Sequence, residues 1–288
     1  MMRSNEVARR VGVLFLAGFL GACLVRMAPG YGISEESLDA RLNADSLAQL
    51  RTLGHRDHNV FTFYGAYLMR AAHGDLGYSQ MLDRPVVQLL GERLPVTLKS
   101  VAIGMTYAWL GAGLLACAMA LAHIPALETI LSALNGLVLC VPAALLGLLL
   151  FLWDFQVAAG IGALVFPKIY TYTRGLIEQG SNSAHVITAR AQGMNPIRVL
   201  VFHAIAPARL EMLALLGITL VAALGSAVPL EVVCDAPGIG QLAWRAAIGR
   251  DMPLLTALTL VMAAITLAAN SLSDVFSARW AAVPASTR

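Results

Sequence analysis

Charged side chains are scarce in this sequence of 288 residues. Asp, Glu, Lys and Arg make up 13% of it, apolar residues make up 58%, and the mean hydropathy is +0.71. Soluble domains typically carry about 25% charged residues. The composition therefore excludes an ordinary globular domain and indicates a protein of the lipid bilayer. A net charge of only +3, scattered along the chain, also argues against a nucleic-acid surface.

Lysine and cysteine are scarce as well. The two lysines follow Leu98 and Pro167, so the chain has no GxxxxGK[ST] loop and does not bind ATP in that way. The four cysteines form no CxxC pair, which indicates neither a disulfide framework nor a zinc site. The HExxH and GxSxG motifs of hydrolases are also absent from the sequence.

Two short motifs look like parts of binding sites but are incomplete. His55 and His58 flank Asp57 at a spacing found in metal sites, yet nothing nearby completes a ligand set, which favours a solvated loop. The "PGIG" stretch at 237–240 lacks the strand and helix of a dinucleotide fold, so a turn is the better interpretation. No metal site is predicted.

Long apolar runs give the main structural signal. A helix rises about 1.5 Å per residue and needs roughly 20 apolar residues to cross the hydrocarbon. The candidate spans are 10–28, 101–124, 130–153, 155–177, 212–233 and 254–275. The sequence therefore predicts an all-α integral membrane protein with about six transmembrane helices.

The first span has an alternative interpretation. Its apolar core covers only 11–25, and arginines flank it, whose long stems can reach the membrane interfaces. Arg9 and Arg10, followed by an apolar run ending in "LGAC" at 20–23, also resemble a signal peptide with a lipoprotein cleavage site. Because "LVRM" continues the apolar run after Cys23, we prefer an uncleaved first helix.

The arginines of the short loops predict the orientation. With six helices, most of them fall on one side, namely Arg3, Arg9, Arg10, Arg174, Arg190, Arg198, Arg209, Arg279 and Arg288. Only Arg245 and Arg250 lie in the short loop opposite. By the positive-inside rule, both termini and the segment 178–211 are expected to be cytoplasmic, and the polar segment 29–100 external.

Four stretches in order along the chain carry a family resemblance. They are "HGDLGYSQMLDRPVVQLLGERLPVTLKS" (73–100), "ITARAQGMNPIRVLVFHAIAPA" (187–208), "LEVVCDAPGIGQLAWRAAIGRDMPLL" (230–255) and "NSLSDVF" (270–276). In this order they resemble the landmarks of the dipeptide/oligopeptide/nickel family of ABC-transporter permeases. "LVRMAPG" (24–30) likewise resembles the end of that family's first helix. The ordered set is more specific than any single match.

The resemblance implies a type I ABC importer permease fold, with one transmembrane permease domain over 1–288. It implies import of peptides or a related small solute by alternating access in a bacterial inner membrane. The implied partners are a second homologous permease subunit, two cytoplasmic ATPase subunits and an external substrate-binding protein, with no nucleic acid. ATP and magnesium belong to the ATPases, so this chain is expected to be no enzyme and to bind no cofactor.

The resemblance also assigns site residues. The cytoplasmic loop of about 178–211 resembles the "EAA" loop, a coupling helix that inserts into a cleft on the ATPase. Small residues are expected where the helix approaches its partner, arginines at the rim, and a helix break at the Asn-Pro pair. The coupling residues are Ala189, Arg190, Ala191, Gly193, Asn195, Pro196 and His203. The external loop residues are Pro237, Gly238, Gly240 and Asp251. The residues of the external segment, about 29–100, are Gly74, Asp75, Leu76, Gly77 and Ser79.

The sequence also departs from the family pattern. Glu211 stands where the family usually has proline, His185 stands where tyrosine is common, and almost nothing but Asp154 joins the third and fourth spans. Taken alone, 187–207 is equally typical of a basic positive-inside loop. The alternative function is therefore a structural membrane subunit that descends from a permease and has lost transport.

Overall fold

The computed structural model describes residues 2–27, 60–122, 124–153 and 155–281. His55, His58 and residues 29–59 of the predicted external segment lie outside these residues. The chain forms two compact units, Met1–Arg93 with Leu242–Ile265, and Leu94–Gln241 with Thr266–Arg288. The helices α4 (Val86–Ala122), α11 (Ile239–Ile248) and α12 (Met252–Ala281) each contribute to both units.

The first unit contains α1 (Met2–Met27), α3 (Val60–Ala72) and a short antiparallel hairpin, β1 (Tyr78–Ser79) with β2 (Arg84–Pro85). Its apolar core is centred on Tyr64 and Met252. The Tyr64 ring meets Phe19 edge to face, with ring centroids 5.7 Å apart, and its hydroxyl donates to the Phe15 carbonyl at 2.7 Å. A Cβ on Gly18 would lie 2.6 Å from the Leu260 side chain, so this glycine allows α1 to approach α12 closely.

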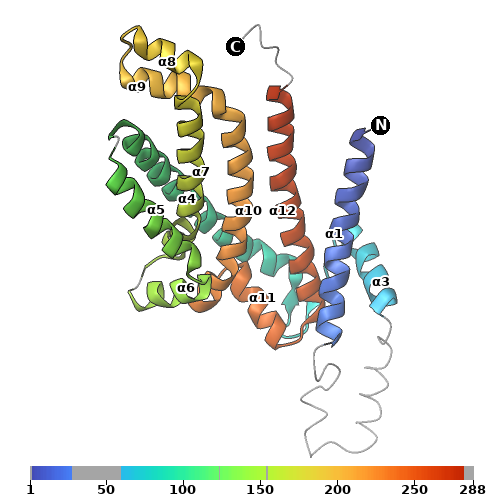
Figure 1. The fold of residues 1–288 in the computed structure, drawn as a ribbon. Coiled ribbons are helices and arrows are strands. Elements are labelled where there is room, and N and C mark those ends of the chain that lie inside the picture. The colour runs from blue at the N-terminus through green and yellow to red at the C-terminus, as the bar shows by residue number, and fades with distance from the viewer. Residues whose placement is uncertain (1, 28–59, 123, 154, 282–288) are drawn as a thin grey trace, which may run out of the picture. The chain divides into compact units, whose positions relative to one another are not determined.

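The second unit is a helical bundle around α7 (Val157–Ser181), which packs on α10 (Arg209–Val233), α5 (Pro125–Cys140) and α6 (Ala143–Leu152) (Figure 1). The α4 and α7 backbones cross closely at two glycines. A Cβ on Gly104 would lie 2.6 Å from the Ala158 carbonyl oxygen, and one on Gly162 would lie 3.0 Å from that of Gly104. Small residues at such crossings let membrane helices pack backbone to backbone.

Among the described residues, three helical segments are long and apolar enough to cross a bilayer, Val86–Ala122, Pro196–Val233 and Met252–Ser271. They contain most of three predicted spans. The predicted span 130–153 is not one straight helix, because α5 and α6 meet at an angle of 97°. Pro142 explains the bend, since it favours an extended conformation at Val141, where φ is −76° and ψ is 121°. The bent pair provides up to one further span, and six spans remain a prediction.

Candidate functional site

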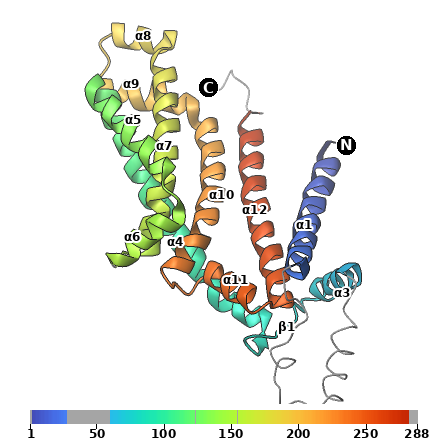
Figure 2. The same cartoon turned by 60° about the horizontal axis from the view of Figure 1, so that its bottom comes forward.

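The predicted coupling loop is a run of short helices between α7 and α10. It consists of α8 (Ala184–Ala191), α9 (Pro196–Val199), the π-helical turn η2 (Leu200–Ile205) and the 3₁₀ turn η3 (Ala206–Ala208). Figures 1 and 2 show α8 and α9 together at one end of α7, with α6 near the other end. A loop folded this tightly can move as one body.

A glycine ends α8. Gly193 has a φ of +75°, its N–H donates to the Arg190 carbonyl at 3.0 Å, and the Met194 N–H donates to the Ala189 carbonyl at 3.3 Å. This is the Schellman pattern, in which a left-handed residue without a Cβ satisfies the last carbonyls of a helix. Nothing lies within 4 Å of a Cβ built on Gly193, so the space around it is open. Both the backbone and the open space favour glycine here.

Ala189 lies inside the loop. It is 4% exposed and packs with Val186, Val199 and the partly buried Met194. The sequence interpretation placed Ala189 where the helix meets its partner, and the structure corrects this. A small side chain is needed at position 189 because α8 packs against α9 there. A side chain buried in this contact cannot face a partner.

The outer face of α8 contains different residues. Ile187 is 60% exposed, and Arg190 and Ala191, three and four residues further on, are exposed on the same side of the helix. An exposed isoleucine next to an arginine is compatible with a docking surface, in which apolar residues lie inside a polar rim. The sequence analysis missed Ile187, although its spacing from the buried Val186 and Ala189 indicates the outer face.

The Asn-Pro pair begins the next helix. The Asn195 Oδ1 accepts the Ile197 N–H at 2.9 Å, which caps α9, and Pro196 is the first residue of that helix. The predicted break is present between α8 and α9, but Gly193 ends α8 before the proline is reached.

Two histidines join α8 to the π-helical turn. The His185 Nε2 lies 2.9 Å from the His203 carbonyl oxygen, and the two rings are 6.4 Å apart. His185, which replaces the family's common tyrosine, therefore holds the start of α8 against η2. At the next residue of η2, a Cβ on Gly180 would lie only 2.6 Å from the Ala204 carbonyl oxygen, so α7 and η2 touch through their backbones.

The external-segment motif folds in the first unit. Gly74 and Gly77 have φ values of +84° and +82°, and Asp75 Oδ1 accepts the Gly77 N–H at 2.8 Å. Gly74 ends α3 in a second Schellman pattern, since its N–H donates to Ala71 and the Asp75 N–H to Arg70. Leu76 is half-buried. These residues shape the turn that leads into the hairpin.

Ser79 and Asp251, predicted in separate motifs, meet in the first unit. The fully buried Ser79 hydroxyl donates to the Asp251 Oδ2 at 2.5 Å, across 172 residues of sequence. The same oxygen accepts the Met81 N–H at 3.1 Å, and the Asp251 Oδ1 accepts the Leu254 N–H at 3.1 Å. Asp251 therefore caps α12 and holds the hairpin at the same time.

The remaining external-loop residues surround a buried carboxyl group in the second unit. Glu231 is 1% exposed, and its Oε2 accepts the Gly240 N–H at 2.7 Å. A Cβ on Gly238 would overlap that carboxyl group, and Pro237 is exposed. The Thr97 hydroxyl accepts the Ile239 N–H at 2.8 Å.

The sequence analysis missed Glu231 and Thr97. The available signal for Glu231 was its place as a single acidic residue at the end of an apolar run. Charged residues inside a membrane span often mark functional sites.

Comparison with known proteins agrees with the resemblance. Residues 112–281, more than half of the chain, match the family described as binding-protein-dependent transport system inner membrane component. A putative peptide permease of Brucella suis is 28% identical over 92% of this chain and 92% of its own. The oligopeptide transport system permease OppB of Salmonella typhimurium is 28% identical over 88% of this chain and 89% of its own. The chain therefore belongs to the family of binding-protein-dependent transport system inner membrane components and is a multi-pass ABC-transporter permease of the peptide and oligopeptide type.

Proposed function

We propose that this chain is the permease subunit of an ATP-driven importer for peptides or a related small solute, and that α8 is its coupling helix. The observation that supports this most directly is the α8–α9 loop, which has its own core and an exposed outer face with Ile187 and Ala191. A surface of this kind fits a groove on a protein partner. The named relatives are peptide and oligopeptide permeases, which supports the substrate class.

The coupling mechanism follows from how the loop is attached. Closure of two ATPase subunits on ATP moves α8, and the loop transmits this movement because its core does not deform easily. The displacement is transmitted to the end of α7 through the Gly180–Ala204 backbone contact, and to α10 through η2 and η3. The spans then shift between inward-open and outward-open arrangements, which requires a partner that binds the two states differently.

The remaining subunits follow from the same proposal. A second homologous permease completes the pathway, and an external binding protein delivers the solute to the opposite face of the membrane. Both termini and the α8–α9 loop are cytoplasmic in this arrangement, as the loop arginines predict. ATP and magnesium are bound by the ATPases.

One observation favours the alternative, a structural subunit that has lost transport. The helix α6 turns away from α5 by 97°, and only 153–156 separate it from α7, so the connection between these helices contributes little to an external face. A small external face offers less surface to a binding protein.

The amount of ATPase that co-purifies with the permease distinguishes an importer permease from a structural subunit. The permease is affinity-purified from cells that also express its ATPase subunits, as wild type and as Ile187→Ala. The truncated side chain loses about 1–2 kcal/mol of burial at the contact, so retention falls roughly five- to thirtyfold. Ile248→Ala, which truncates an isoleucine of similar exposure on α11, serves as the matched control. No ATPase with the wild type, or equal retention in all three, contradicts the proposal.

A further inference from the structure

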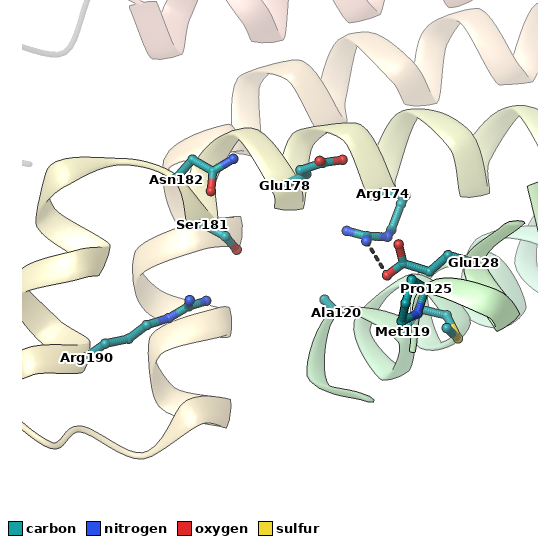
Figure 3. A pocket seen from close by; sticks show the side chains of 9 residues that line it. All are labelled: Met119, Ala120, Pro125, Glu128, Arg174, Glu178, Ser181, Asn182 and Arg190. Atoms are coloured by element: carbon teal, nitrogen blue, oxygen red, sulfur yellow. Dashed lines mark hydrogen bonds and ion pairs between the residues drawn. The ribbon is translucent and has the colours of Figure 1, made fainter. Parts of the chain in front are cut away.

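A polar pocket lies beside α8 in the second unit (Figure 3). Its volume is about 500 Å³, which is within the range of roughly 300–1,000 Å³ for small-molecule sites. The end of α4, the start of α5, the end of α7 and one residue of α8 form its walls. The polar lining residues are Glu128, Arg174, Glu178, Ser181, Asn182 and Arg190.

Two of the four charges in the lining neutralise one another. The Arg174 guanidinium lies 2.5 Å from the Glu128 carboxylate, and both side chains are partly buried, at 21% and 32% exposure. Among the described residues, the side chains of Glu178 and Arg190 have no hydrogen-bond or ion-pair partner. The pocket therefore offers one free carboxylate and one free guanidinium.

The free charges lie on different helices. Figure 3 shows Arg190 reaching in from α8 on one side and the Arg174–Glu128 pair on the other, with Glu178, Ser181 and Asn182 along the end of α7. A ligand with one charge would pair with Glu178 or with Arg190 and leave the other without a partner. A ligand with an ammonium and a carboxylate group satisfies both, and hydrogen bonds to charged groups are the strong ones.

We propose that this pocket binds a zwitterionic ligand, a short peptide or an amino acid, and that the bound ligand holds α8 against α7. The inference rests on the proposed function, in which the pocket faces the cytoplasm, where delivered solute accumulates. A ligand between Glu178 of α7 and Arg190 of α8 resists the movement of the coupling helix. Delivered peptide therefore slows further import.

A binding experiment tests the ligand class. The permease–ATPase complex without its binding protein is placed in lipid nanodiscs and titrated calorimetrically with trialanine, with alanine and with trialanine capped at both ends. Uncapped trialanine or alanine should bind and the capped peptide should not. Comparing the two uncapped probes distinguishes a peptide site from an amino-acid site.

Two variants assign the binding to this pocket. Glu178→Gln and Arg190→Gln should each weaken affinity about tenfold, because each removes one charge-assisted contact. Arg198→Gln, an exposed arginine of α9 that does not line the pocket, is the matched control and should bind as the wild type does. Unchanged affinity in both pocket variants, equal binding of the capped peptide or no binding of either uncapped probe overturns the proposal.

A transport experiment tests the consequence. Proteoliposomes are loaded with trialanine, and uptake of labelled peptide is compared with that of empty vesicles. Internal trialanine should slow wild-type uptake and leave Glu178→Gln unaffected, and Ser181→Trp, which fills the pocket, should give a second insensitive variant. Equal slowing in wild type and both variants refutes the inference. If the complex assembles and imports peptide but shows no such slowing, only the pocket proposal fails, whereas loss of ATPase retention contradicts the proposed function itself.

Discussion

A series of substitutions at Gly193 separates the backbone role of this residue from a contact with a partner. The φ of +75° strains any residue that has a Cβ, at a cost of about 1–2 kcal/mol, whereas asparagine tolerates this conformation better. Gly193→Ala should therefore destabilise the loop by about 1 kcal/mol and Gly193→Asn by less. Because no atom lies within 4 Å of the added Cβ, alanine and tryptophan differ mainly in what they meet outside the chain.

Gly193→Trp therefore reports on the partner. Overpacking a fitted contact costs about 1–3 kcal/mol, roughly a five- to hundredfold loss of affinity. We expect ATPase retention at matched expression to fall in the order glycine, asparagine, alanine and tryptophan, with the largest step between alanine and tryptophan. Coupled ATP hydrolysis should follow the same order. Equal retention for alanine and tryptophan would show that nothing docks at Gly193 and would refute the reasoning.

Three further predictions concern the external motifs and the topology. Asp251→Ala removes the cap of α12 and leaves the buried Ser79 hydroxyl without its acceptor, so it should lower the free energy of unfolding by about 1–3 kcal/mol. Thermal unfolding measures this loss, and Gln80→Ala, at an exposed position next to Ser79, should leave the stability unchanged. Gly238→Ala places a Cβ against the Glu231 carboxyl group and should destabilise the protein. Gly91→Ala, in open space on α4, should leave the stability unchanged or raise it. A Gly238→Ala variant that is more stable than Gly91→Ala would contradict the packing argument. Reporter fusions after Met194 and Arg279 should report the cytoplasm and those after Arg84 and Gly240 the outside, and an external signal at Met194 would contradict the proposed orientation.

Apolar periodicity and length predicted the helical class and located most of the long helices. The helix α10 ends at Val233, as predicted, because an apolar run and a turn-forming stretch meet there. The α5–α6 bend was missed because a length count treats 130–153 as one run. Pro142 was the available signal, yet a proline is compatible with an unbroken helix, as Pro95 within α4 and Pro167 within α7 show. Whether such a proline bends a helix depends on its neighbours in space.

The sequence predicted a helical loop at the candidate site, but it did not show which side chains of that loop are buried. Family order located the coupling loop, and the structure forms a compact helical loop there. A motif does not show which way a small side chain points, so Ala189 was assigned to the surface when it belongs to the core of the loop. The contact between Ser79 and Asp251 spans 172 residues, and no local pattern indicates such a pairing. Contacts of this kind depend on tertiary packing.

The structure of the loop also explains how the loop can keep its shape where the sequence departs from the family pattern. Gly193, Asn195 and the Val186–Ala189–Val199 core each act through local contacts, so the shape of the loop is set within the loop itself. Backbone atoms join the loop to α7, at the Gly180–Ala204 contact, and join α8 to η2, at the carbonyl of His203 that His185 meets. A backbone carbonyl accepts from a tyrosine hydroxyl as readily as from an imidazole N–H. The change from tyrosine to His185 can therefore preserve the attachment, because the acceptor does not depend on the side chain at either position.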